Sequence, residues 1–204
     1  MKFLRNLEGL VALQPDFIGF IFYAKSPRYV IGELRPEDVK SIPASIKKVG
    51  VFVNEDRQRL LELVKEYDID LVQLHGDEPP GYCAEVQKNI PVMKAFSMSD
   101  DVDFCAIDAY EKYIDYFLFD TKTPKYGGSG LQFNWEVLNK YSLDRPFFLS
   151  GGIGVADLDK IKKLDFPHLY AIDINSKVEV GPGLKDLPMI EEFKKGLEKE
   201  VGST

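Results

Sequence analysis

The chain has little of what marks secreted, metal-binding or membrane proteins. Among its 204 residues are only two cysteines, Cys83 and Cys105, and their spacing fits neither a disulfide framework nor a metal site. No apolar run reaches the length of a transmembrane helix, and no segment near the N-terminus resembles a signal peptide. We therefore expect a cytoplasmic protein without a metal ion or a membrane anchor.

Positive charge is also scarce. Lysine and arginine number 26 against 33 acidic residues, so the formal net charge is −7. This balance argues against nucleic acids and anionic membranes as partners, since both attract basic patches. It leaves room for a small anionic ligand, because backbone N–H groups and one or two arginines can bind a phosphate locally.

What is present is enough apolar sequence for a packed core, with 45% hydrophobic and 29% charged residues. No linker, composition shift or low-complexity segment divides the chain, so residues 1–204 are expected to form one domain.

Apolar strands alternate with amphipathic helices along the chain. A helical stripe runs from Leu7 to Leu13 and ends at Pro15. Strands are predicted at 17–23, 47–54, 70–76, 91–97, 115–120, 146–152 and 169–175, and further helices at 35–42, 55–68, 79–90, 100–113, 134–141, 155–164 and 186–200. Eight helices with seven strands indicate an α/β fold, a TIM (β/α)8 barrel that lacks its first β-strand in this sequence. A doubly wound open sheet is the alternative.

In a TIM barrel, function gathers at the carboxyl ends of the strands. This rule selects a set of residues that follow the predicted strands: residues 23–28, Asn54, Gln73, His75, Lys94, Asp120, Ser150, Gly151, Gly152 and residues 173–176.

Asp120 ends the apolar strand FLFD, and a carboxyl group at that rim suits a general acid. A helix cap or a salt bridge to Lys122 is the alternative. The following KYGGSG segment, with Gly127 and Gly128, could close over a ligand or be a plain surface loop.

Two consecutive strands end in small polar residues. Gly151 and Gly152 follow one strand, and Asn175 and Ser176 follow the next, which favours a phosphate site over ordinary turns. Arg28 could clamp a carboxylate or be a surface charge.

Three further residues have structural alternatives. A lone histidine such as His75 is more often structural or solvated than functional. Cys83 and Cys105 fall in predicted outer helices, where we expect buried hydrophobic side chains rather than nucleophiles.

Taken in order, the motifs resemble a known family. GFIFYxKSPRYV, VGVFVN, LVQLHG, DTKTPxYGGSG, LSGG and DINSxVExxPGxKD closely resemble phosphoribosylanthranilate isomerase of tryptophan biosynthesis, over almost the whole chain. The resemblance implies a TIM barrel without cofactor or metal. It also implies an aldose–ketose (Amadori) rearrangement of N-(5′-phosphoribosyl)anthranilate to 1-(2-carboxyphenylamino)-1-deoxyribulose 5-phosphate.

The resemblance also implies roles for particular residues. Asp120 corresponds to the general acid and Arg28 to the residue at the anthranilate end. Gln73 and His75, selected by the strand-end rule, are expected to be further substrate contacts. The phosphate falls on the last two loops, at Gly151, Gly152, Asn175 and Ser176. The partner is then a small phosphoribosyl compound, and the protein a monomer or homodimer.

One departure concerns the N-terminus. Family members begin with a strand resembling K-[IV]-C-G-[MI], whose cysteine is the general base, and ungapped alignment puts Met1 just after that Cys-Gly. The chain as written is expected to be N-terminally truncated and inactive. Either the start codon was misassigned, or a natural variant has lost catalysis.

Two rival functions follow from these observations. One is a non-catalytic barrel that binds phosphoribosyl compounds. The other is another phosphosugar barrel such as indole-glycerol-phosphate synthase, which needs lysine and glutamate motifs that have no match in the early strands.

Overall fold

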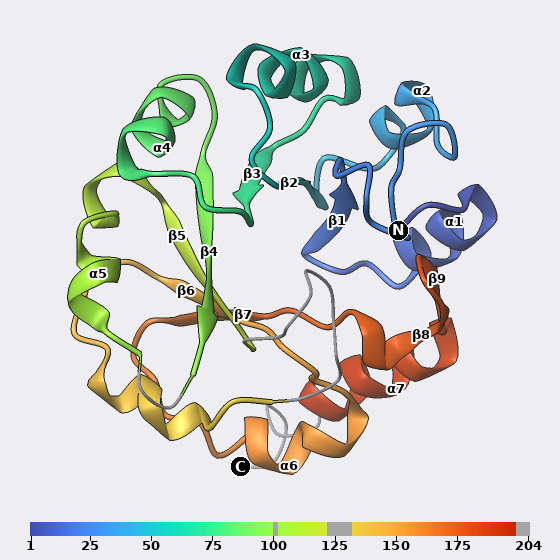
Figure 1. Cartoon of the computed structure of the whole chain (residues 1–204). Coiled ribbons are helices and arrows are strands. Elements are labelled where there is room, and N and C mark those ends of the chain that lie inside the picture. Colours follow the sequence, from blue (N-terminus) through green and yellow to red (C-terminus); the bar gives the residue numbers. More distant parts are fainter. Residues whose placement is uncertain (100–101, 122–131, 199–204) are drawn as a thin grey trace.

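The computed structural model describes residues 1–99, 102–121 and 132–198, and its main feature is a curled parallel sheet with helices outside it (Figure 1). Seven strands lie in chain order, β1-β2-β3-β4-β5-β6-β7, and every neighbouring pair is parallel. They are β1 (Phe17–Ile21), β2 (Lys47–Phe52), β3 (Leu71–Leu74), β4 (Val92–Met98), β5 (Tyr116–Thr121), β6 (Phe147–Leu149) and β7 (Leu169–Ile172). The strand order confirms the barrel-type fold over the doubly wound alternative, in which the order reverses.

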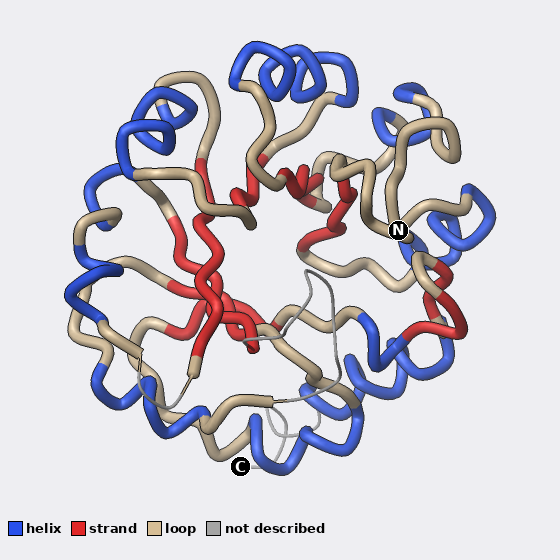
Figure 2. The backbone as a smooth tube through the Cα atoms, viewed as in Figure 1, coloured by secondary structure: helices blue, strands red, loops and turns tan. Residues whose placement is uncertain are grey.

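The helices form the outer layer (Figure 2). The α-helices are α1 (Leu4–Ala12), α2 (Pro36–Lys40), α3 (Arg57–Tyr67), α4 (Pro80–Gln87), α5 (Phe104–Asp108), α6 (Leu158–Ile161) and α7 (Leu187–Glu198). Four short 3₁₀ helices supplement them: η1 (Glu111–Tyr113), η2 (Trp135–Lys140), η3 (Val155–Asp157) and η4 (Ser176–Val178). None of the helices in the described residues is long and apolar enough to cross a bilayer.

The strands bury both of their faces, as continuous apolar runs predict. Toward the helices, Phe20, Phe52, Phe117 and Phe147 belong to the large core cluster. On the inner face, a smaller cluster joins alternate residues of five strands: Val49, Leu71, Met93, Ala95, Leu118 and Phe148. The inner cluster fills the middle of the curled sheet, as in a barrel whose interior is packed rather than hollow.

The sheet does not close within the described residues. β1 and β7 each pair with one neighbouring strand and form the two edges, as expected if a first strand is absent from this sequence. The amino group of Met1 donates to the carbonyl of Gly19 on β1 (3.3 Å), so the first described residue lies against one edge.

Several local expectations were wrong. Cys83 is buried on α4 as predicted, but Cys105 is exposed on α5, because its side chain lies on the solvent side of that short helix. The predicted helix at 134–141 is the 3₁₀ helix η2, and the predicted helix at 155–164 divides into η3 and α6. A two-stranded hairpin, β8 (Glu179–Gly181) and β9 (Leu184–Lys185), was not predicted.

Candidate active site

A cavity of about 640 Å³ lies at the carboxyl ends of the strands and continues between the facing edges of β1 and β7. Its walls include almost all the described residues that the sequence pointed to: Arg28, Gln73, His75, Asp120, Gly151, Gly152, Asn175 and Ser176. These residues are far apart in the sequence, and the curled sheet brings them around one space.

The wall formed by β3 and β5 carries three interacting polar side chains. Gln73 Nε2 lies 2.8 Å from His75 Nδ1, and His75 Nε2 lies 3.4 Å from Asp120 Oδ2. When the Gln73 amide donates to Nδ1, the imidazole proton resides on Nε2 and faces the carboxylate. The other oxygen of Asp120, Oδ1, accepts from the backbone N–H of Thr121 (2.8 Å). Asp120 is thus held in a fixed orientation at the cavity wall, next to a titratable imidazole.

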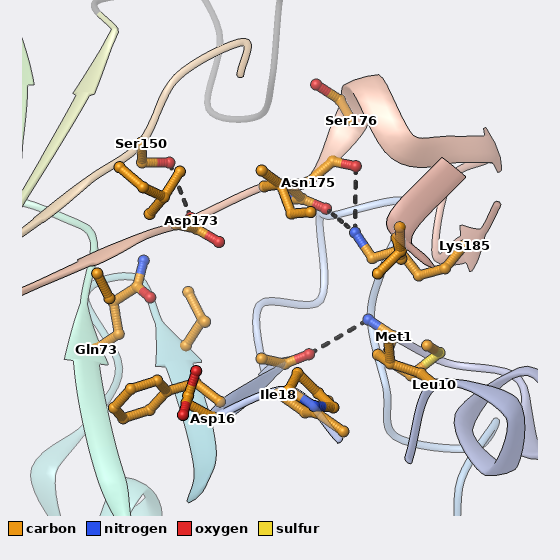
Figure 3. Close-up of a pocket in the computed structure, with 18 of the residues that line it drawn as sticks. Met1, Leu10, Asp16, Ile18, Gln73, Ser150, Asp173, Asn175, Ser176 and Lys185 are labelled. Atoms are coloured by element: carbon orange, nitrogen blue, oxygen red, sulfur yellow. Dashed lines mark hydrogen bonds between the residues drawn. The ribbon is translucent and has the colours of Figure 1, made fainter. Parts of the chain in front are cut away.

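A second carboxyl group, that of Asp173, lies just beyond β7. Ser150 Oγ donates to Asp173 Oδ2 (2.8 Å), a contact that Figure 3 shows inside the cavity. Burial raises the pKa of Asp173, and this effect exceeds the opposing hydrogen bond from Ser150 and the charge of Lys185. The cavity therefore contains two carboxyl groups in different settings, one beside an imidazole and one that accepts a hydrogen bond from a hydroxyl.

The two glycines after β6 have backbone conformations that disfavour other residues. Gly151 has φ +99° and Gly152 φ +65°. A Cβ at Gly151 would lie 2.2 Å from Thr121 Oγ1 and 2.6 Å from Thr121 N, so this turn packs directly against the end of β5. Asn175 and Ser176 line the same cavity, at the start of η4. The expected phosphate residues therefore all line the same cavity.

Arg28 makes a buried two-point ion pair inside the chain. Its Nε and Nη2 donate to Glu179 Oε2 (2.9 and 2.7 Å), and Nε also lies 3.2 Å from Oε1. Lys185 Nζ approaches the same carboxylate at 3.2 Å. Burial opposes ionisation of Glu179, but the hydrogen bond from Arg28 and the charges of Lys185 and Arg28 lower its pKa. In the described residues the carboxylate that Arg28 clamps is that of Glu179, and contact between Arg28 and the anthranilate end of a substrate stays a prediction.

Other residues selected by the strand-end rule lie elsewhere. Lys94 is 2% exposed and pairs with Glu78 (3.0 Å) rather than lining the cavity. Asn54 binds the same loop, since its N–H donates to Glu78 and its Oδ1 accepts from Asp77 N–H. Gly127 and Gly128 lie outside the described residues. Within residues 1–99, 102–121 and 132–198, no three His, Cys, Asp or Glu side chains are grouped to hold a metal ion.

The sequence-based site omitted Glu179 and Lys185. Both come from the unpredicted hairpin, which folds back so that Lys185 reaches the cavity wall. The available signal was the VExxPGxKD part of the last motif, where both residues stand at fixed spacing. Charge pattern alone could not show that they meet Arg28.

Comparisons with known proteins agree with this geometry. The family profile described as N-(5′-phosphoribosyl)anthranilate (PRA) isomerase matches residues 3–196. A relative from Parabacteroides distasonis, named N-(5′-phosphoribosyl)anthranilate isomerase, is 40% identical over 197 residues, covering 95% of this chain and 88% of its own.

Solved structures show the same likeness. A phosphoribosyl anthranilate isomerase from Thermotoga maritima superposes with a TM-score of 0.84 at 35% identity, covering 98% of this chain and 96% of that one. A phosphoribosyl anthranilate isomerase in complex with reduced 1-(o-carboxyphenylamino)-1-deoxyribulose 5-phosphate has a TM-score of 0.81 at 30% identity, over 98% of this chain and 95% of its own. With a profile match over nearly all residues and these relatives, the chain belongs to the N-(5′-phosphoribosyl)anthranilate isomerase family.

Proposed function

We propose that this protein acts on N-(5′-phosphoribosyl)anthranilate, the compound in the names of its relatives, and converts it to 1-(2-carboxyphenylamino)-1-deoxyribulose 5-phosphate. The observation that carries the proposal is the Asp120–His75 contact on the wall of a cavity that Arg28 and the Gly151-Gly152 turn also line. The cavity thus combines an acid with candidate sites for the two anionic ends of such a substrate.

The chemistry assigned to the residues is as follows. Asp120 donates a proton to the ribose ring oxygen, and the C1–O bond breaks as the nitrogen lone pair forms an iminium ion. Loss of the C2 proton to a base then gives an enolamine, which becomes the ketone when C1 is protonated. The 3.4 Å contact supports His75 as the group that exchanges a proton with Asp120 between turnovers. The Gly151-Gly152 turn, Asn175 and Ser176 bind the phosphate.

Neither of the two cysteines lies at the cavity in the described structure, where the base would have to act. Cys83 is buried on α4, where burial raises the pKa of its thiol to about 11, and Cys105 lies on α5. A thiol acts as a base through its ionised form, so neither is placed or tuned for the role. We therefore propose that residues 1–204 by themselves bind the substrate and isomerise it slowly.

The position of both cysteines away from the cavity favours a second candidate, a barrel that binds phosphoribosyl compounds without converting them. The test combines calorimetric titration of reduced 1-(o-carboxyphenylamino)-1-deoxyribulose 5-phosphate with a chromatographic assay for the ketose product. Binding with turnover supports the isomerase, whereas binding without turnover supports the second candidate for this chain. A Kd weaker than about 1 mM, with no product formed, would overturn both.

A further inference from the structure

Lys185 is a buried lysine whose donors are all directed to specific acceptors on the cavity wall. Its Nζ donates to Asn175 Oδ1 (2.7 Å) and to Asn175 O (3.2 Å), and it lies 3.2 Å from Glu179 Oε1. Figure 3 shows the two contacts with Asn175 at the edge of the cavity. Three acceptors match the three N–H donors of an ammonium group, so the geometry fits the charged form. Burial lowers the pKa of Lys185, and the charges of Glu179 and Asp173 oppose this effect.

Within the group of Arg28, Glu179 and Lys185, the formal charges do not cancel. Arg28 and Glu179 form a closed pair, with their side chains 11% and 2% exposed, which leaves little net charge for a ligand. Lys185 adds one more positive charge against the same carboxylate, at 9% side-chain exposure. The cluster of Arg28, Glu179 and Lys185 is therefore net positive only because of Lys185, and its burial weakens screening by solvent.

We propose that Lys185 is a positioning residue that makes this cluster a receptor for a ligand carboxylate, by leaving the Arg28–Glu179 pair with a surplus positive charge. The proposal rests on the proposed function and assigns recognition of the aromatic carboxylate to the cluster rather than to Arg28 alone. Because Asn175 shares the same ammonium group, Lys185 also joins the carboxylate end of the cavity to the expected phosphate end.

A purely structural role makes a different prediction. If Lys185 only tied the hairpin to Asn175, its loss would weaken every ligand of the cavity to a similar extent. If its charge acts as proposed, its loss weakens ligands that carry the carboxylate more than ligands that lack it. The discriminating quantity is therefore the ratio of the two affinities in each variant.

The experiment uses two ligands and three variants, with Kd measured by calorimetry. The ligands are reduced 1-(o-carboxyphenylamino)-1-deoxyribulose 5-phosphate and the same compound without the ring carboxylate. Lys185→Gln keeps N–H donors for Asn175 and Glu179 but removes the charge, and Lys185→Met removes both. Lys194→Met is the matched control, because Lys194 lines the same cavity at its opposite end, beside Leu13 and Gln14.

In the wild-type protein and in Lys194→Met, the carboxylate should strengthen binding by about tenfold or more, in the range measured for close charge pairs. In Lys185→Gln and Lys185→Met this preference should fall to about twofold or less. Lys185→Gln should unfold at nearly the wild-type temperature, which keeps the test valid if Lys185→Met folds poorly. Full carboxylate preference in Lys185→Gln would overturn the inference.

Failure of the proposed function gives a different pattern. If the wild-type protein binds neither phosphorylated compound, the proposed function fails. The inference is then decided with anthranilate alone as the probe. Binding to the wild type and to Lys194→Met, but not to Lys185→Gln, supports it, and equal binding or no binding to all three contradicts it.

Discussion

His75 Nε2 lies 3.4 Å from Asp120 Oδ2, although β4 lies between the strands that carry the two residues. The contact exists because the sheet curls, so that side chains at the carboxyl ends of β3 and β5 converge toward the inside. Gln73 fixes the opposite nitrogen of the imidazole at 2.8 Å. The arrangement places a carboxyl group and an imidazole next to each other on the cavity wall, as the proposed roles of Asp120 and His75 require.

Replacing Asp120 with asparagine tests the proposed role of Asp120 as the general acid. In a chain with measurable turnover, Asp120→Asn should lower kcat by about 10²–10⁴-fold, because an amide cannot protonate the ring oxygen. Affinity for the reduced product should change far less, since the side chain keeps its size. Asp165→Asn, on an exposed loop carboxylate, is the control and should keep its kcat. A loss of less than about tenfold for Asp120→Asn would remove Asp120 from the acid role.

A second prediction concerns the turn after β6. Gly151 has φ +99°, a backbone conformation that alanine disfavours. In Gly151→Ala the Cβ would also lie only 2.2 Å from Thr121 Oγ1, and the nearby Thr121 N belongs to the backbone and cannot rotate away. We expect a loss of about 1–3 kcal/mol in the free energy of unfolding, and weaker binding of phosphorylated ligands. Denaturant unfolding followed by circular dichroism measures the first quantity.

The matched control for that substitution is Gly81→Ala on α4, where a Cβ meets nothing within 4 Å. Alanine is the better helix former, so stability there should be unchanged or slightly raised. Equal stability of both variants would mean that the turn after β6 relaxes freely.

Much of the fold followed from sequence because long apolar runs are a strong signal. The strands from Phe17, Lys47 and Tyr116 begin within one residue of the predicted positions. The hairpin β8–β9 was missed because strands of two or three residues, around Gly181, carry no periodicity. That residues 1–204 form one single domain stays a prediction.

The individual residues of the site could be predicted from the sequence, but the contacts between their side chains could not. The strand-end rule selects Gln73, His75 and Asp120 separately, and no local pattern shows that their side chains meet. Arg28 and Glu179 are 151 positions apart in the sequence. Only the fold therefore shows that the Arg28 guanidinium already binds a carboxylate of the chain itself. The phosphate role of Gly151 and its neighbours stays a prediction.

A third prediction uses the partly buried carboxyl group of Asp173. Its pKa is raised above the ordinary value of 3.8, mainly by burial, so the folded protein binds this proton more tightly than the unfolded chain does. The stability that this proton contributes is fully present below the ordinary pKa and is lost as pH rises through the raised one. Asp173→Asn cannot ionise and can still accept from Ser150.

The free energy of unfolding of Asp173→Asn, relative to wild type, should therefore increase as pH rises from about 4 to about 8. Denaturant titrations at a series of pH values provide the measurement, and other ionisable groups largely cancel in the difference. A difference that stays constant, or falls with pH, would show that Asp173 ionises normally in the folded state.

The last prediction concerns the space between β1 and β7. Both strands have an edge without a strand partner in the described residues, and the cavity continues between them. An added N-terminal segment of the family type, Lys-Val-Cys-Gly directly before Met1, should pair with both edges and raise the unfolding temperature. It should also bring a thiol to the carboxyl end of the sheet, where a thiolate can take the C2 proton.

Two extended chains separate these effects, one with the cysteine and one with alanine in its place. Both should be more stable than residues 1–204, because strand pairing depends on the backbone and satisfies exposed N–H and C=O groups. Only the chain with cysteine should gain turnover, by about 10²-fold or more, since proton transfer by a positioned base contributes at least that much. If residues 1–204 alone matched the cysteine chain in kcat/KM, the base would have to be a residue already on the cavity wall. Asp173 would be the first to replace, because its carboxyl lies in that wall beside Ser150.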